Sequence, residues 1–112
     1  MVFLSETDMI QGSPLPGWRG RFFHSENMTF ARWTISADAH DLHEHQHEQE
    51  EVWNIVEGSI VLNVDGSEKE MVAGTAAVVP PNTPHSVRII GPAEIVVADF
   101  PVRRDLPGVP TP

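Results

Sequence analysis

The chain has 112 residues, no cysteine and a formal net charge of −9 at pH 7. A chain of this length has room for one hydrophobic core, so we expect a single domain over residues 1–112. Without cysteine there is neither a disulfide nor a thiolate ligand, so any metal would bind through nitrogen and oxygen atoms. The negative charge disfavours nucleic acid and anionic membranes as partners.

The chain contains no apolar run of the roughly 18 residues that a membrane-spanning helix needs. Its first ten residues, MVFLSETDMI, lack the basic and apolar regions of a secretory signal. We therefore expect a protein of the cytoplasm. A small acidic ligand is not excluded, because a bound cation or one arginine can dominate the field inside a pocket.

The predicted elements begin with an irregular arm over residues 1–22, which mixes glycine, proline and serine around Trp18. After it, short segments rich in valine and isoleucine alternate with turn residues, which predicts β-strands. The expected strands cover residues 28–36, 51–56, 59–64, 68–73, 75–79, 85–90 and 93–99. Asp65 and Gly66 mark a tight hairpin between two of them.

The chain ends in a tail, residues 101–112, with four prolines. Such a tail cannot continue a central strand or a helix, so we expect it to be extended. The domain core then covers about residues 24–100. No segment shows ten or more residues of helical periodicity, and short strands at this spacing are typical of a sandwich or barrel. The predicted fold class is all-β.

Four histidines gather in residues 40–47, next to several carboxylates. In an extended strand His43, His45 and His47 would share one face, where two imidazoles can converge on a single ion. A charge-rich stretch is most often a solvated loop. This one, however, runs directly into the apolar residues VWNIV, which should line the core. The pattern therefore indicates a metal site.

The segment HQHEQEEVWNIVEG resembles the first motif of the cupin family, with His45, His47, Glu51 and a closing glycine at the required spacing. GTAAVVPPNTPH resembles the second cupin motif and places His85 at its histidine position. The resemblance implies a double-stranded β-helix, or jelly-roll barrel, of antiparallel strands. It also implies that these four side chains hold one divalent transition metal.

Three motif positions depart from the cupin pattern, but none is a ligand: Ala39 and Asn82 replace glycines, and Ile89 replaces an asparagine. Asparagine tolerates a positive φ better than most residues, so the turn at Asn82 can survive. Three imidazoles and one carboxylate suit Fe, Mn, Ni, Co or Zn and leave coordination positions open for a small ligand in the barrel. The alternative is a cupin whose histidines are only structural.

Each metal ligand needs a partner that fixes its orientation, and the sequence offers His43, Glu48 and Glu50 for that role. If Glu51 points inward, period-two alternation sends Trp53 inward too. Trp53 would then either stack on a ligand or simply fill the core.

Asp99 ends the apolar run AEIVVA on the last predicted strand. A buried unpaired carboxylate is costly enough to indicate a purpose, such as that of a general base. The alternative is an aspartate that caps the strand end at the surface.

The C-terminal stretch is similar to that of the small cupins that ketonise unsaturated uronates in pectin and alginate breakdown. Those proteins carry a catalytic aspartate on the last strand and an arginine just beyond it. In the matching register Arg103 takes the arginine position, Val97 stands at the aspartate position, and Asp99 follows on the same face. The resemblance thus implies Asp99 and Arg103 as catalytic residues, although that family often has glutamine in place of Glu51.

Three functions remain open. The first is a metal-dependent isomerase or lyase acting on a small carbohydrate-derived acid, in which Asp99 moves a proton and Arg103 holds a carboxylate. The second is a dioxygenase that uses Fe(II) and O2, as in quercetinase-like cupins. The third is a non-catalytic metal-binding or ligand-binding sensor, because fold does not fix function. We also expect a homodimer, since a small open sandwich has exposed strand edges that need covering.

Overall fold

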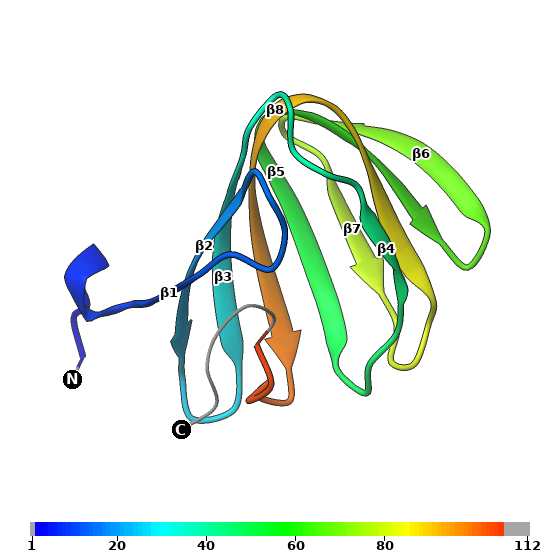
Figure 1. The fold of residues 1–112 in the computed structure, drawn as a ribbon. Coiled ribbons are helices and arrows are strands. Elements are labelled where there is room, and N and C mark those ends of the chain that lie inside the picture. Colours follow the sequence, from blue (N-terminus) through cyan, green and yellow to red (C-terminus); the bar gives the residue numbers. More distant parts are fainter. Residues whose placement is uncertain (1, 107–112) are drawn as a thin grey trace.

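The computed structural model describes residues 2–106, which form eight β-strands and one short 3-10 helix (Figure 1). The helix, η1, covers Glu6–Asp8. The strands are β1 (Ile10–Gly12), β2 (Trp18–His24), β3 (Thr29–Ile35), β4 (Leu42–His45), β5 (Glu50–Val64), β6 (Ser67–Val72), β7 (Ala76–Val79) and β8 (His85–Phe100). No helix in this part of the chain is long and apolar enough to cross a membrane.

The strands pair antiparallel in the order β1-β2-β3-β8-β5-β6, with β4 added on β8 and β7 added on β5. Strands β5 and β8 are long, and each contributes to both layers of a double-stranded β-helix (Figure 1). Residues 93–99 of β8 lie between β3 and β5, whereas residues 85–87 lie between β4 and the second half of β5. The predicted all-β fold is confirmed.

The long strand β5 crosses from one layer to the other at Gly58, where its pairing with β8 slips. Gly58 has a φ of 71°, and a Cβ atom at this position would lie 2.1 Å from the carbonyl oxygen of Pro92. Only glycine fits such a backbone approach. The slip shifts the ladder without ending it, so β5 and β8 continue through the crossing. This corrects the prediction of separate short strands over 51–56 and 59–64 and over 85–90 and 93–99.

The predicted irregular arm, residues 1–22, is wrong over its second half. Residues 18–24 form β2, which pairs along its whole length with β3. Its inward side chains Trp18 and Phe22 are only 2% and 1% exposed, and both pack edge-to-face on Trp33. Burial of these aromatic rings stabilises a strand in spite of the glycine and prolines nearby.

The predicted hairpin at Asp65 and Gly66 is confirmed. The two residues have φ values of 51° and 86°, and Val64 pairs with Ser67 on either side of them, which is the geometry of a two-residue turn. Asn82 also adopts a positive φ, 54°, as its turn requires.

The described part of the predicted extended tail turns back onto the barrel instead of leaving it. Leu106 is 7% exposed and belongs to the core between the layers. The backbone N–H of Arg103 donates to the hydroxyl of Thr29 on β3 at 2.8 Å. Residues 101–106 therefore close one end of the interior, and residues 107–112 lie outside the described residues.

Candidate metal centre

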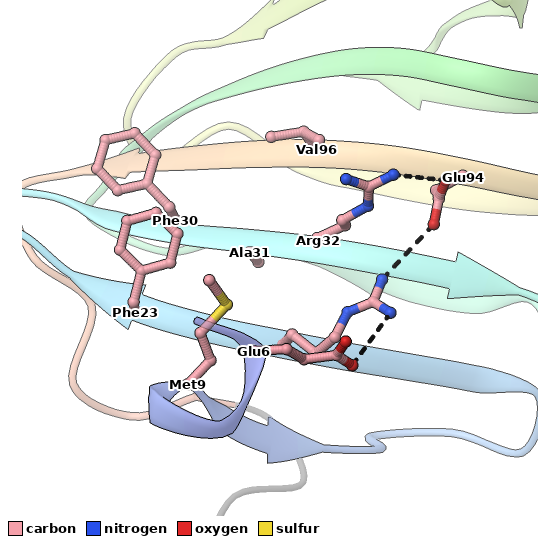
Figure 2. A pocket seen from close by; sticks show the side chains of 9 residues that line it. Glu6, Met9, Phe23, Phe30, Ala31, Arg32, Glu94 and Val96 are labelled. Atoms are coloured by element: carbon pink, nitrogen blue, oxygen red, sulfur yellow. Dashed lines mark hydrogen bonds and ion pairs between the residues drawn. The ribbon is translucent and has the colours of Figure 1, made fainter. Parts of the chain in front are cut away.

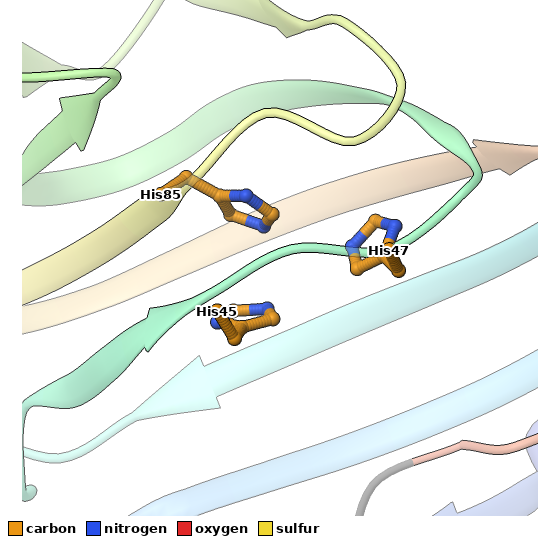
Figure 3. A group of neighbouring side chains, drawn as sticks. All are labelled: His45, His47 and His85. Atoms are coloured by element: carbon orange, nitrogen blue, oxygen red, sulfur yellow. The ribbon is translucent and has the colours of Figure 1, made fainter.

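Three histidines, two of them close together in the sequence and the third about 40 residues later, converge inside this closed end (Figure 3). His45 ends β4, His85 begins β8, and the pairing of these two strands sets the residues opposite one another. His47 follows in the loop between β4 and β5. One nitrogen atom of each ring lies within 4.8 Å of those of the other two.

Hydrogen bonds to backbone carbonyls orient two of these rings. The Nδ1 atom of His45 lies 3.0 Å from the carbonyl oxygen of His43, and that of His85 lies 2.9 Å from the carbonyl oxygen of Thr83. Because a carbonyl can only accept, each Nδ1 must carry the hydrogen, and the neutral ring then keeps its lone pair on Nε2. That is the tautomer in which a histidine binds a metal through Nε2.

Glu51, on β5, faces the same point and is 3% exposed. Its Oε2 lies 3.3 Å from Nε2 of His47, and its Oε1 lies 3.3 Å from Nε2 of His85. The indole N–H of Trp53 donates to Oε1 at 2.6 Å. Burial alone would raise the pKa of Glu51, but the contacts with His47 and His85 outweigh it and hold this pKa well below its usual range. The carboxylate is therefore ionised at neutral pH.

Asp99 lies directly across from Glu51 in the β5–β8 ladder and is 5% exposed. The alternative of a surface strand cap is therefore wrong. Burial raises the pKa of Asp99 to about 9, and the neighbouring Glu51 charge acts in the same direction. Its Oδ1 has no hydrogen-bond partner among the described residues. Together with His47 and Glu51, Asp99 forms a second set of ligand atoms within 4.8 Å of one another.

Arg103 reaches this pair of carboxylates from the segment that closes the barrel. Its NH1 lies 3.7 Å from Oε2 of Glu51 and 3.9 Å from Oδ2 of Asp99. A cavity of about 50 Å³ adjoins these groups, with Trp18, Phe22, Trp33 and Val97 among its apolar walls and Arg103 and Leu106 at its closed side. A water molecule needs about 10–15 Å³ of such space, so this conformation has room for only a few water molecules.

The residues fit a bound metal ion. Several buried polar atoms at this point have no hydrogen-bond partner among residues 2–106, namely Nδ1 and Nε2 of His47, Nε2 of His85 and Oδ1 of Asp99. Leaving such atoms unpaired costs about 1–3 kcal/mol each, so their convergence needs an explanation. A divalent cation among nitrogen and carboxylate donors would satisfy them, and this donor set suits Fe, Mn, Ni, Co or Zn.

The partners of these side chains differ from the predicted ones. The side chains of His43, Glu48 and Glu50 are exposed, so none of the three supports a ligand through its side chain, and His43 orients His45 only through its backbone carbonyl. The proposed ligands are instead held by backbone carbonyls and by the indole of Trp53. Thr29, which is 1% exposed, is a further residue of this region that the sequence motifs do not indicate. The sequence does carry a sign of it: along β3, Thr29 falls on the same alternating positions as the buried apolar residues.

Comparison with known proteins identifies a family. The family described as "Cupin domain" matches residues 31–99 of this chain. The uncharacterized protein MJ1618 of Methanocaldococcus jannaschii is 34% identical over 62 residues, which are 54% of this chain and 49% of that protein. The chain therefore matches about half the length of this curated relative.

Solved structures share the fold over most of the chain. An RmlC-like cupin from Shewanella frigidimarina NCIMB 400 has a TM-score of 0.84 at 22% identity and covers 94% of this chain and 95% of its own. KdgF from Halomonas sp. has a TM-score of 0.81 at 20% identity, with 92% and 97% covered. Oxalate decarboxylase of Bacillus subtilis, a protein with Mn(II) centres, has a TM-score of 0.77 at 19% identity, with 88% and 29% covered.

Proposed function

Because the chain belongs to the cupin family, we propose that it binds one divalent transition metal, Fe, Mn, Ni, Co or Zn, inside its barrel. The proposed ligands are His45, His47, Glu51 and His85. The observation that carries this proposal is the convergence of buried, unpaired ring nitrogens on the ionised carboxylate of Glu51. The Mn(II) centres of the structurally similar oxalate decarboxylase support it.

We further propose that the protein is an isomerase or lyase for a small carbohydrate-derived acid. A bound metal would supply a Lewis acid that polarises a carbonyl or hydroxyl oxygen of the substrate. Arg103 would hold the substrate carboxylate, since its guanidinium lines the cavity beside Glu51. Asp99 would exchange a proton with the substrate, since its Oδ1 is free of other partners.

The resemblance of the Asp99 and Arg103 region to the cupins that ketonise unsaturated uronates supports a uronate-like substrate, and the fold shared with KdgF agrees with it. The cavity of about 50 Å³ is too small for a sugar acid. Binding would therefore require a wall of the cavity to move, and residues 101–106, which carry Arg103, form one such wall. Cytoplasmic location remains part of the proposal and can be tested by cell fractionation.

Elemental analysis of protein purified without a nickel column tests the metal proposal, with about one metal ion per chain as the expected result. Turnover is then measured on a panel of sugar acids, including unsaturated uronates, and of phenolics, while oxygen uptake is recorded. Conversion of a sugar acid without oxygen uptake is expected. Iron with oxygen uptake would favour a dioxygenase, and ligand binding without turnover would favour a sensor.

A further inference from the structure

Most of the candidate site is carried by paired strands. Strand β8 lies between β3 and β5 over residues 93–99, and Glu94 of β8 contacts Arg32 of β3 at 2.8 Å and Arg21 of β2 at 3.6 Å (Figure 2). His85 begins this strand, and His45 lies opposite it on β4. Strand pairing therefore fixes the backbone positions of these two proposed ligands.

His47 is the exception, because it lies in the loop between β4 and β5 and belongs to no strand. Backbone carbonyls orient the rings of His45 and His85 through Nδ1. The Nδ1 atom of His47 is buried and has no hydrogen-bond partner among the described residues. The place of this ring in the site must therefore be set through the main chain of the loop.

The turn between β7 and β8 supplies this hold on the loop. The backbone N–H of Asn82 donates to the carbonyl oxygen of His47 at 2.8 Å, and no other backbone hydrogen bond holds residues 46–49 within the described part of the chain. Asn82 makes this contact with a left-handed backbone, at a φ of 54°, while its side chain is exposed. The position therefore contributes its backbone conformation and its N–H rather than its side chain.

The same turn also orients His85. The carbonyl oxygen of Thr83 accepts a hydrogen bond from Nδ1 of His85 at 2.9 Å. The backbone N–H of Asp65 braces the turn from the neighbouring hairpin by donating to the carbonyl oxygen of Pro84 at 2.8 Å. One turn thus holds a ligand from each of the two motifs, His47 through its main chain and His85 through its ring.

We infer that Asn82 is a positioning residue, whose left-handed backbone holds the loop so that the ring of His47 meets the other proposed ligands. This role rests on the proposed metal binding. A loop without this hydrogen bond would have to be ordered each time a metal binds, and that ordering would weaken the binding. Loss of a partner that orients a metal ligand typically costs 10- to 100-fold in affinity.

The Co(II) affinity of the full chain, measured by competition with a chelator of known affinity, tests this role. Asn82→Pro removes the N–H and fixes φ at a negative value, so it should lower the affinity about 10-fold or more. Asn82→Gly keeps both the N–H and the left-handed backbone, and should bind Co(II) as the natural protein does. Asn82→Ala keeps the N–H but disfavours the left-handed backbone, so its affinity should fall between the two.

Gly74→Pro is the matched control. Gly74 also has a positive φ, 87°, and its N–H donates to the carbonyl oxygen of Ile55 at 2.9 Å, in the turn between β6 and β7. This variant should lose thermal stability as Asn82→Pro does but keep its Co(II) affinity. Natural affinity in Asn82→Pro, or an equal loss in Gly74→Pro, would overturn the role of Asn82. If Asn82→Pro does not fold, natural affinity in Asn82→Ala would overturn it.

Hydrogen exchange of the metal-free protein separates this role from the proposed function, because it needs no metal. The amide at position 82 is protected while it is bonded to the carbonyl of His47. Its protection factor, measured by NMR, should fall several-fold in Asn82→Ala and stay near the natural value in Asn82→Gly. An unchanged factor in Asn82→Ala would overturn the hold on the loop even if the protein binds Co(II). A natural protein that binds no Co(II) would overturn the metal proposal, and the positioning role with it, even if the factor falls as expected.

Discussion

At the scale of single residues, the carboxylate of Glu51 connects the parts of the candidate site. Its two oxygens contact His47 and His85, and the indole N–H of Trp53 occupies a further position on Oε1. Its ionised state therefore depends on cationic or donor groups on every side. A bound metal ion would be held by this carboxylate together with the ring nitrogens around it.

His45→Ala and His85→Ala should each lower the metal content several-fold, because each removes a ring whose Nε2 is oriented toward the site. Both variants should also lose the increase in melting temperature that added metal gives the natural protein. Elemental analysis and thermal unfolding check these expectations. The control is His43→Ala, since the exposed His43 contributes only its backbone carbonyl. Equal metal loss in the control would show that the ligands have been chosen wrongly.

Trp53→Phe should lower the metal affinity about 10-fold. The substitution keeps an aromatic ring in the core but removes the N–H that holds Oε1 of Glu51, and loss of such an orienting partner typically costs 10- to 100-fold in affinity. Competition with a chelator of known affinity measures the effect. Trp33→Phe, which alters an indole of the same core without touching Glu51, is the matched control. Equal metal affinity in the two variants would show that Trp53 only fills the core.

Asp99→Asn should leave the metal content nearly unchanged and lower turnover of the substrate by about 100-fold or more. The amide has the shape of the carboxyl group but can neither release nor take up a proton. The measurement is the turnover rate of the metal-loaded variant on whichever substrate the panel identifies. A parallel loss of metal would instead indicate that Asp99 is a ligand, as its place beside His47 and Glu51 permits.

At the scale of elements, the segment 101–106 brings Arg103 to the site, and the hydroxyl of Thr29 holds it there. Thr29→Val removes this hydroxyl at almost constant volume. Loss of one hydrogen bond worth about 1 kcal/mol should speed hydrogen exchange of the Arg103 amide about 5-fold. Exchange measured by mass spectrometry over the segment tests this, with Thr34→Val on the outer face of β3 as the control. Unchanged exchange in Thr29→Val would mean that the other contacts of the segment, such as the burial of Leu106 in the core, anchor it.

The strands that sequence reading predicted well are those whose signals are local. Alternating apolar residues and the Asp65-Gly66 turn fix the position of the hairpin between β5 and β6 without reference to the rest of the chain. Strand β2 was not predicted, because Arg19, Gly20 and Arg21 dilute its apolar pattern, and the strand depends on pairing with β3 and on packing against Trp33. The continuity of β5 also depends on a distant residue, since its slip occurs against Pro92.

In the candidate site, too, some features follow from local sequence and others depend on distant residues. Motif spacing places His45, His47 and Glu51 together, because these residues are close in the sequence. The partners that orient them depend on pairings between strands far apart in the chain. No local pattern could show that the carbonyl of Thr83 would orient His85, or that Thr29 would hold Arg103.

At the scale of the whole molecule, a barrel that encloses ionisable groups has a stability that depends on pH. Burial and the Glu51 charge raise the pKa of Asp99 to about 9 in the metal-free protein. Burial lowers the pKa of His85, but its contact with Glu51 outweighs this and raises it. Both groups bind their protons more tightly in the folded state than in the unfolded state. The stability that they contribute is therefore present at low pH and is lost as the pH rises.

The metal-free protein should consequently become less stable between pH 7 and pH 9. In this range the unfolded Asp99 is already ionised while the folded one still holds its proton, so the slope can reach about 1.4 kcal/mol per pH unit for this group. Glu51, whose pKa is held low, is ionised in both states at these pH values and adds no slope. Urea unfolding of metal-stripped protein at pH 7, 8 and 9 gives the free energies of unfolding. Asp99→Asn should flatten the dependence, and a natural protein whose stability is constant or rises over this range would show that Asp99 is not protonated in the folded barrel.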